Sequence, residues 1–467
     1  MMNRDVPETK IVETNEGAVD GQNKCPKCGA TDISLNIKTS MLRCNFCRHE
    51  FQAERAVGLD TDLSKLEGKI VGSGTMNIEA DTDDIITLKC TSCAAEVVID
   101  TNEAMGARCH WCRNTLSISE QVPNGAVPDM VLPFSVAKNE AQAEIDTFVK
   151  KRQFFAHPKF KAEYCTENIL GVYLPYMIVG MNAKANFSGQ GERLVRTYST
   201  GSGKNRRTAY DADLYDVGRQ FDLVIDGLTI VSSADKLDRS SGRTNNIINA
   251  IKPFDHENCV KWDANYLKGL ASEKRDTNVD DLTRSVEIKA KDIARHSANK
   301  TITEYNRGVR WDREQLEVKG QQWKASYLPI WLYSYQQKRT DGNNLLHYVA
   351  VNARNRRTMG SVPIHTAKLF LFALMVQIIG TIAGFFMAFN LFAAYDEGLA
   401  ALALLGSGFL YYFYYYRKYR NTKARFKHET DTKTELTNVR KHDKLLTRRT
   451  RLRNPRMDGA NNLRVDY

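Results

Sequence analysis

The sequence predicts an α+β protein with two small four-cysteine zinc ribbons, a mixed α+β cytosolic domain and a C-terminal hairpin of two transmembrane helices. Three observations predict it: a repeated cysteine pattern, a globular middle region, and two uncharged apolar blocks near the C-terminus. The expected order is a disordered N-terminus (1–22), ribbon 1 (23–52), a linker (53–86), ribbon 2 (87–117), the cytosolic domain (131–363), two membrane helices (369–394 and 399–416) and a basic cytosolic tail (417–467). The linker is predicted because residues 53–86 are polar and contain Gly68, Gly72 and Gly74.

Eight of the ten cysteines form two copies of the pattern C-x2-C-x15-C-x2-C, offset by 65 residues. Four thiolates on two knuckles suit tetrahedral Zn²⁺ and leave no coordination position for water, so we expect two structural zinc ions per chain. Iron is the alternative metal, and a cytosolic location disfavours disulfides. The expected ligands are Cys25, Cys28, Cys44, Cys47, Cys90, Cys93, Cys109 and Cys112.

The two cysteine patterns also agree between the ligands, which indicates an internal duplication. Residues 43–48 (RCNFCR) match residues 108–113 (RCHWCR). Gly29 follows the first knuckle of copy one, where a left-handed turn favours glycine, whereas copy two has Ala94. The second site is therefore expected to be looser than the first.

Signals for catalysis are weak. Gly201–Lys204 is similar to part of a phosphate-binding loop, but Tyr198 and Asn205 stand where that motif requires Gly and Ser or Thr. We therefore expect no enzymatic activity. Four other residues are expected to lie beside the metal sites or to be ordinary half-buried thiols: His49, His110, Cys165 and Cys259.

The two apolar blocks, Leu369–Ala394 and Leu399–Tyr416, contain no charged residue. At ~1.5 Å per residue each is long enough for a hydrocarbon core of ~30 Å. Lys368 precedes the first block and Arg417 follows the second, whereas the connector at 395–398 has no basic residue. The positive-inside rule then predicts a multi-pass protein of the cell membrane with both termini in the cytosol. The alternative is a buried helical hairpin in a soluble core.

The formal net charge of +11 is unevenly distributed. Residues 417–467 carry 16 Lys and Arg against 6 Asp and Glu, whereas residues 1–130 carry 13 against 20. The basic segment 417–467 is expected to contact anionic lipids or an acidic partner, with simple solvation as the alternative. Nucleic acid is a further alternative, but the zinc-bearing region lacks the basic surface that this function requires.

The middle of the chain predicts a mixed α+β domain. Tyr173–Ile178 (YLPYMI) is similar to Tyr327–Leu332 (YLPIWL), which suggests a duplicated half-domain, and the proline in each predicts an edge strand or a bulge. Periodicity and composition predict helices over 138–156 and 283–305, strands over 170–181 and 347–352, and hairpins over 183–226.

Several short motifs resemble the YdjG-like proteins, TFIIB-type zinc-ribbon membrane proteins of bacterial envelope-stress loci. They are Leu132-Pro133-Phe134, Gly171–Tyr176, Lys252-Pro253-Phe254, Tyr266–Gly269 and Tyr327–Trp331. The resemblance implies a membrane-anchored adaptor at the cytosolic face of the inner membrane. It also implies two partners, a PspA-like membrane-remodelling protein and a second membrane protein.

We expect the adaptor to present its ribbons and residues 131–363 as docking surfaces, with the acidic run Asp81, Asp83 and Asp84 as a weaker candidate. The alternative function is a membrane-tethered nucleic-acid-binding protein, with a role in replication or transcription, that uses the ribbons or the basic tail.

Overall fold

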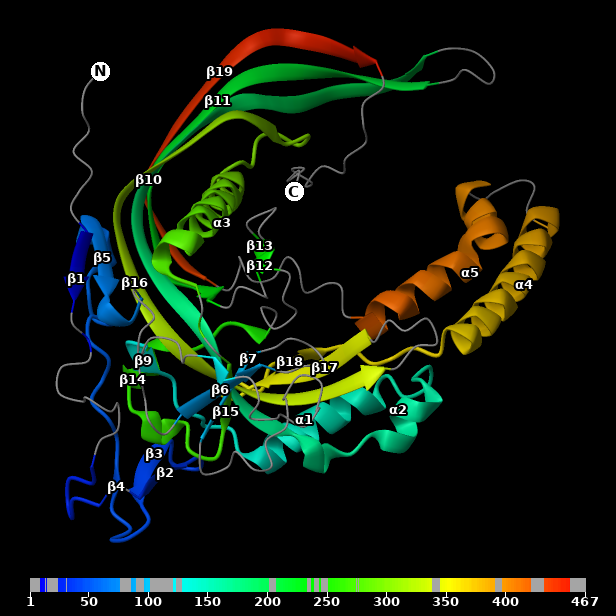
Figure 1. The fold of residues 1–467 in the computed structure, drawn as a ribbon. Coiled ribbons are helices and arrows are strands. Elements are labelled where there is room, and N and C mark those ends of the chain that lie inside the picture. The colour runs from blue at the N-terminus through cyan, green and yellow to red at the C-terminus, as the bar shows by residue number, and fades with distance from the viewer. Residues whose placement is uncertain are drawn as a thin grey trace.

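The computed structural model describes residues 9–12, 14, 24–30, 32–75, 85–89, 96–100, 121–122, 128–200, 207–232, 237–238, 243–244, 251–273, 275, 277–337, 345–390, 397–420 and 432–453. Within these ranges the protein is mixed α+β, as the sequence predicts, and a single sheet of 14 strands joins most of the chain. Figure 1 shows this sheet as a tall arch, with a pair of helices projecting to one side.

The helices are α1 (Lys138–Lys150), α2 (Pro158–Glu163), α3 (Val279–Lys300), α4 (Thr366–Asn390) and α5 (Glu397–Arg420). The strands of the large sheet are β1 (Thr9–Val12), β5 (Gly68–Gly72), β6 (Ile85–Lys89), β7 (Glu96–Asp100), β8 (Gln121–Val122), β9 (Met130–Val131), β10 (Leu170–Thr200), β11 (Arg207–Val231), β14 (Val260–Lys261), β15 (Ala271–Glu273), β16 (Val309–Gln337), β17 (Leu345–Asn352), β18 (Thr358–Gly360) and β19 (Lys433–Arg453). Two smaller sheets are formed by β2 (Ile33–Asn36), β3 (Met41–Cys44) and β4 (Glu50–Phe51), and by β12 (Leu237–Asp238) with β13 (Arg243–Thr244).

The arch is built from four long strands, β10, β11, β16 and β19 (Figure 1). The first half of β10 is buried on both faces, and its second half alternates, with Ala185 and Phe187 buried and Asn186 and Ser188 exposed. A period of two places the buried residues on one face of a strand. That face packs against the apolar side of α3, which contributes Val286, Ala290 and Ile293. The apolar cluster around α3 therefore lies on the concave side of the arch.

Two prolines lie at the centre of the sheet and reveal an internal two-fold relation. β10 and β16 pair antiparallel so that Tyr173 faces Pro329 and Pro175 faces Tyr327. The short strand of each repeat pairs with the long strand of the other repeat: β9 pairs parallel with β16, and β15 pairs parallel with β10. Both repeats then run short strand, helix and long hairpin, which supports the predicted duplication.

The expectation that these prolines mark edge strands is wrong, because β10 and β16 lie inside the sheet. Each proline falls where the neighbouring strand changes, from β15 to β11 beside β10 and from β9 to β17 beside β16. Proline has no amide hydrogen to give to a ladder, and a break in the neighbouring ladder accommodates this loss. Both proline carbonyls still accept hydrogen bonds, from Ser232 N at 3.1 Å and from Ala353 N at 3.2 Å.

The structure differs from the sequence prediction at the N-terminus (1–22) and in the linker (53–86). β1 pairs parallel with β5, and β5 pairs with β16, so both segments contribute to the large sheet. The buried carboxylate of Asp129 holds this corner together by accepting hydrogen bonds from Thr14 Oγ1, Gly74 N and Ala325 N. A Cβ added at Gly72 would lie 2.4 Å from Asp129 Oδ2. The glycines that suggested a linker therefore permit close packing.

The predicted basic tail (417–467) also differs. Its first residues continue α5, and β19 runs antiparallel to β11. Two basic residues of β19 face aspartates of β11, Lys433 opposite Asp226 and Lys444 opposite Asp216, whereas Lys441 faces Arg219. The sequence of this segment shows an excess of cations, but it does not show that aspartates of β11 lie opposite two of them.

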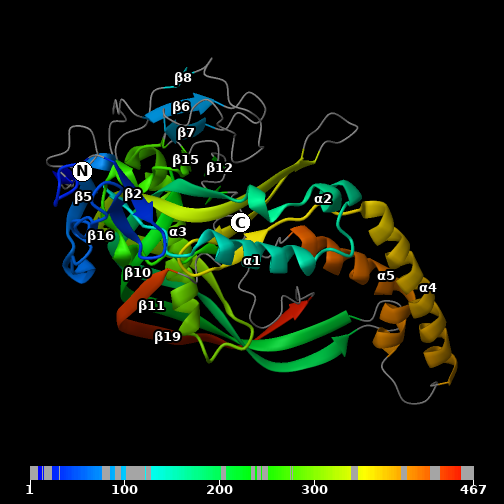
Figure 2. The ribbon, with the colours of Figure 1, turned by 90° about the horizontal axis from the view of Figure 1, so that it is seen from below.

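The remaining helix and strand predictions hold with shifted ends. The helix expected over 138–156 ends at Lys150, and that expected over 283–305 begins at Val279, after an Asn278–Asp281 capping box. The strand at 347–352 is β17, and the hairpin expected over 183–226 is the longer pair β10–β11. Figure 2 shows α1 and α2 beside the bases of α4 and α5.

Candidate metal centre and candidate membrane span

The first four predicted ligands converge. The thiol groups of Cys25, Cys28, Cys44 and Cys47 lie within 4.8 Å of one another and form a group that could hold a metal ion. Two Sγ–Sγ distances, Cys25–Cys47 and Cys28–Cys44, are both 3.6 Å. A disulfide would require ~2.05 Å, whereas thiolates ~2.3 Å from a tetrahedral ion lie about 3.8 Å apart. The geometry therefore fits a metal ion and excludes disulfides among these four residues.

Two matching backbone turns aim the thiols inward. In the first knuckle Gly29 N donates to Cys25 O, and in the second Arg48 N donates to Cys44 O. Both turns close through a left-handed residue, Gly29 at φ +73° and Arg48 at φ +59°. The left-handed turn at Gly29 could be predicted from the sequence because glycine favours it, whereas the turn at Arg48 could not.

The pKa values of the thiols indicate a cluster that a cation would stabilise. Burial acts to raise the pKa of Cys25, but the backbone amides of Cys28 and Lys27 and two neighbouring thiols outweigh it and lower the pKa to about 7. At Cys28 the amide of Ala30 acts to lower the pKa, but burial and the other thiols raise it to about 12. Four thiolates repel one another until a metal ion neutralises them.

The ribbon is packed onto the α+β domain. Cys25, Ile33, Leu42 and Cys44 are buried in the same apolar cluster as Phe134. Ser40 Oγ donates to Phe134 O at 2.8 Å, and Ala53 N donates to the Tyr266 hydroxyl at 3.3 Å. The ribbon is therefore one surface of the domain and has a fixed orientation on it.

The other histidine and cysteine predictions have separate outcomes. His49 stacks on Phe51, with ring centroids 6.1 Å apart, and is not part of the metal-binding group. Cys259 is fully buried near Ser326, and burial raises the pKa of its thiol to about 12, whereas Cys165 is half-buried. Both are free thiols. His110 and the phosphate-loop-like residues 201–204 lie outside the described residues.

The second predicted site, formed by Cys90, Cys93, Cys109 and Cys112, lies outside the described residues. The strands around it are described: β6 pairs with β7 and β8, and β7 pairs with β15 of the domain. β7 occupies the place that β2 would take after a shift of 65 residues. The second zinc ribbon therefore stays a prediction.

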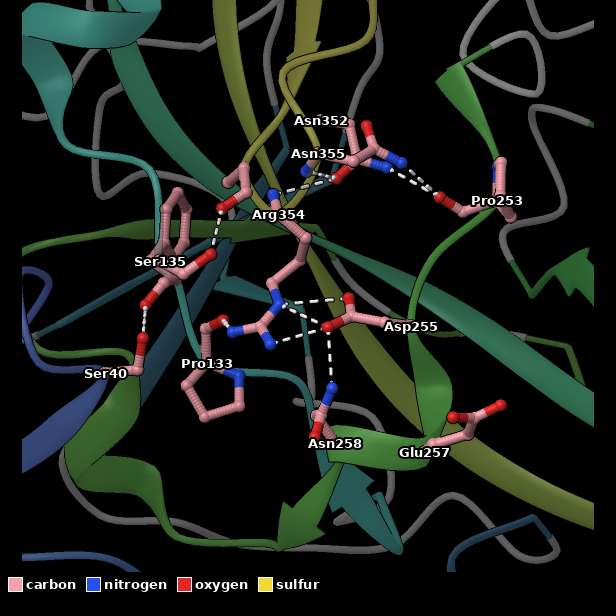
Figure 3. Close-up of polar contacts among 12 residues, drawn as sticks. Ser40, Pro133, Ser135, Pro253, Asp255, Glu257, Asn258, Asn352, Arg354 and Asn355 are labelled. Atoms are coloured by element: carbon pink, nitrogen blue, oxygen red, sulfur yellow. Dashed lines mark hydrogen bonds and ion pairs between the residues drawn. The ribbon is translucent and has the colours of Figure 1, made fainter.

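Arg354 forms a polar hub that the sequence reasoning missed (Figure 3). Its guanidinium pairs with Asp255, with an Nη2–Oδ2 distance of 2.6 Å, and donates to Pro133 O at 3.1 Å. Beside it, Asn352 Nδ2 donates to Pro253 O at 3.0 Å. The hub ties Leu132-Pro133-Phe134 to Lys252-Pro253-Phe254, two of the motifs on which the sequence resemblance depends. Arg354 is thus a structural residue.

A cavity of about 400 Å³ adjoins this hub and is lined by residues that include Lys252, Arg354 and His256. Several of its charged groups are paired with one another. His256 lies 3.2 Å from Asp226, and this contact lowers the pKa of the Asp226 carboxyl despite its burial. The ion pairs hold the cavity wall together.

Helix α4 is long and apolar enough to cross a membrane over Thr366–Phe385, with a mean hydropathy of 1.9 and only 17% of this stretch buried. It packs against α5, where Gly408 N donates to Gln377 Oε1 at 2.9 Å. A Cβ added at Gly408 would lie 2.6 Å from Ala373 O, so glycine permits this close approach. α4 is therefore a candidate membrane span with an exposed apolar surface.

The chain matches no protein-family model, no curated protein and no solved structure. Its function is therefore argued from the geometry described above.

Proposed function

We propose that this protein is a non-catalytic adaptor that holds a Zn²⁺-stabilised docking surface at a fixed position beside a membrane. One observation carries the proposal. A single apolar cluster contains the metal-ligand residues Cys25 and Cys44 as well as Leu369 and Tyr419, which lie on α4 and α5. Close-packed side chains transmit position with little slack. A partner bound to the ribbon would thus be held at a defined distance from the helix pair.

The joint between the domain and the helix pair supports this rigid arrangement. Phe155 is fully buried, its amide donates to the Tyr419 hydroxyl at 2.8 Å, and its ring lies 5.1 Å from that of Tyr415. Arg152 Nε donates to Lys418 O at 3.1 Å. A flexible tether would need none of these contacts, so the joint favours positioning over simple anchoring.

The pairing of β19 with β11 supports two membrane crossings. α4 and α5 lie between residues 9–360 and β19 in the sequence, yet β19 belongs to the same sheet as β11. Both ends of the helix pair must therefore lie on one side of a membrane, and the number of crossings must be even. If α4 crosses, α5 crosses back. Lys368, Arg417 and Lys418 then mark the cytosolic side of the inner membrane, with both termini in the cytosol.

The ribbon tip offers a contact for a protein partner. Phe46 lies between two ligands and is 81% exposed, with Arg43 and Arg48 on either side. Aromatic and arginine side chains dominate the binding energy of many protein interfaces. We propose that Phe46 is the centre of the docking surface. The resemblance to YdjG-like proteins makes a PspA-like protein, together with a second membrane protein, the first partners to test.

The charge distribution favours a protein partner over nucleic acid. Two of the basic residues of β19, Lys444 and Lys433, lie opposite Asp216 and Asp226 on β11. Cations matched in this way contribute less to the phosphate binding on which nucleic-acid affinity depends.

The test is photocrosslinking of the full chain in its native membrane, with a photoreactive phenylalanine analogue at position 46. The control places the same analogue at Val57, which is 52% exposed and outside the knuckle. We expect one specific crosslinked partner at position 46, and loss of that partner from gentle detergent extracts of Phe46→Ala. Equal crosslinking at both positions, or an unchanged partner in Phe46→Ala, would overturn the proposed docking surface.

A further inference from the structure

Residues 151–159 join α1 to α2 and include the first two residues of α2. This segment lies against the bases of α4 and α5, and we call it the elbow. Two neighbouring phenylalanines in the elbow have opposite environments. Phe155 is fully buried and forms the joint with α5, whereas Phe154 is 53% exposed. The Phe155 contacts fix the backbone of the elbow, so the exposed position of Phe154 is imposed by the fold.

Phe154 lies at the level of the candidate span. Its ring is 5.1 Å from that of Phe372, edge to face, and Phe372 is inside the apolar stretch Thr366–Phe385. The α4 residues nearby in the sequence extend this apolar surface, since Phe370 is 61% exposed and Leu371 is 63% exposed. An aromatic residue of the sheet domain therefore adjoins the surface that a bilayer would cover.

One cationic side chain contacts this aromatic residue, and two more lie close to it in the sequence. Lys368 Nζ lies 4.0 Å from the centroid of the Phe154 ring and donates to Phe154 O at 2.9 Å. Lys151 and Lys159 are exposed on either side of Phe154 in the sequence. An aromatic ring with lysines at its border matches the boundary between acyl chains and anionic headgroups.

We propose that the elbow is a membrane-insertion site, in which Phe154 enters the leaflet that faces the sheet and Lys151 and Lys159 bind the headgroups of anionic phospholipids. The proposal rests on the membrane anchoring proposed above. The occupant is lipid because Phe154 contacts Phe372 on α4, and the neighbouring α4 residues Phe370 and Leu371 are apolar and exposed. The elbow thereby sets the angle between the sheet domain and the bilayer.

The sequence analysis assigned the attraction to anionic lipids to the basic segment 417–467, and we now propose that the elbow contributes to it. In β19, Lys433 and Lys444 face aspartates of β11. Lys151 and Lys159 are exposed, and the segment that carries them lies against the bases of α4 and α5. The elbow is therefore the better placed of the two basic regions for lipid.

Insertion is tested with tryptophan as a depth probe in the full chain, reconstituted into nanodiscs that contain brominated phosphatidylglycerol. Phe154→Trp is compared with Phe385→Trp, inside the span, and with Phe46→Trp, at the ribbon tip, after subtraction of the signal of the unsubstituted chain. We expect quenching of Phe154→Trp and Phe385→Trp but not of Phe46→Trp. Quenching of Phe385→Trp alone would overturn the elbow proposal and leave the span intact. Absence of quenching at both positions would overturn the span itself.

The headgroup preference is tested with Lys151→Gln/Lys159→Gln in the same nanodiscs without bromine. Each lysine near an anionic surface contributes about fivefold to binding. We therefore expect the ratio of phosphatidylglycerol to phosphatidylcholine retained on the extracted protein to fall several-fold, while the zinc content is unchanged. An unaltered lipid ratio would overturn the lysine contacts. Lys65→Gln, an exposed lysine in the segment that follows the ribbon, is the control and should retain the original ratio.

Discussion

The first ribbon and the C-terminal strand β19 both lie at the margin of the same domain, but their contacts are made over very different distances along the chain. The ribbon's four thiols come from the short stretch Cys25–Cys47. β19 depends on β11, and the ion pair that joins them, Arg219–Asp443, links residues 224 positions apart. The comparison shows that a local chemical pattern can be recognised in a sequence, whereas a charge has no assigned role until its partner is known.

The largest expected effect concerns the ribbon. Cys44→Ser removes one ligand and one buried apolar contact, so we expect the loss of one metal ion per chain and unfolding of residues 23–52. Binding of a structural Zn²⁺ supplies about 10–16 kcal/mol in small zinc domains, far more than the ~1 kcal/mol of a typical hydrogen bond. Elemental analysis and limited trypsin digestion at Arg43 and Arg48 measure the two effects.

Cys165→Ser is the matched control for this prediction, because Cys165 is half-buried and outside the metal-binding group. It should keep the zinc content and the digestion pattern of the unsubstituted chain. A Cys44→Ser protein that retains all its zinc and resists trypsin at Arg43 would show that the ribbon is held by packing on the domain instead of by metal.

This contrast also explains what could be predicted from the sequence. The cysteine spacing identified all four ligands of the first site, and strand alternation after Ala183 identified the hairpin. The role of Gly72 depended on Asp129, and that of Lys433 on Asp226, both distant in the sequence. Glycine and charge therefore suggested a linker and a tail, because their partners only become visible in the folded sheet.

The second prediction concerns the ion pair between Arg219 of β11 and Asp443 of β19, which we call the anchor of β19. Arg219 is fully buried, with an Nη1–Oδ1 distance of 2.5 Å to Asp443 and an Nε–Oγ1 distance of 3.1 Å to Thr301. Arg219→Met leaves Asp443 without its cation, and loss of one partner of a buried pair costs about 3 kcal/mol or more. We expect trypsin to cleave β19 at Arg440 and Lys441 at least tenfold faster than in the unsubstituted chain.

Arg193→Met is the control for the anchor, because Arg193 pairs with Asp213 at 3.2 Å but is 53% exposed. Exposed pairs contribute less than about 1 kcal/mol, so cleavage of β19 should hardly change. If both substitutions release β19 equally, the buried pair is not its anchor.

The third prediction concerns the contact between Gly58, in the segment that follows the ribbon, and Lys324 of β16. Lys324 Nζ donates to Gly58 O, and burial lowers the pKa of this lysine from 10.5 to about 8. The unfolded chain then binds more protons than the folded chain between about pH 8 and 10.5, so this lysine makes stability rise with pH in that window. At pH 7, Lys324→Met should increase the free energy of unfolding by up to about 3 kcal/mol and thus raise the thermal midpoint. Above pH 8 the free energy of unfolding of this variant should rise less with pH than that of the unsubstituted chain. A lower midpoint at pH 7 would show that the hydrogen bond to Gly58 outweighs the burial of charge.

The smallest expected effect tests the charge ladder between β11 and β19. Asp216 faces Lys444 across the strand pair, and such a pair contributes about 0.2–1 kcal/mol. Asp216→Asn should therefore speed trypsin cleavage at Lys444 by no more than about fivefold at 0.1 M salt, with no difference from the unsubstituted chain at 1 M, where the Debye length is only ~3 Å. Arg219→Met should keep its large effect at both salt concentrations, because a buried pair is poorly screened. A salt-independent effect of Asp216→Asn would mean that Asp216 acts through the packing of β11, and the basic residues of β19 would then remain available to an outside partner.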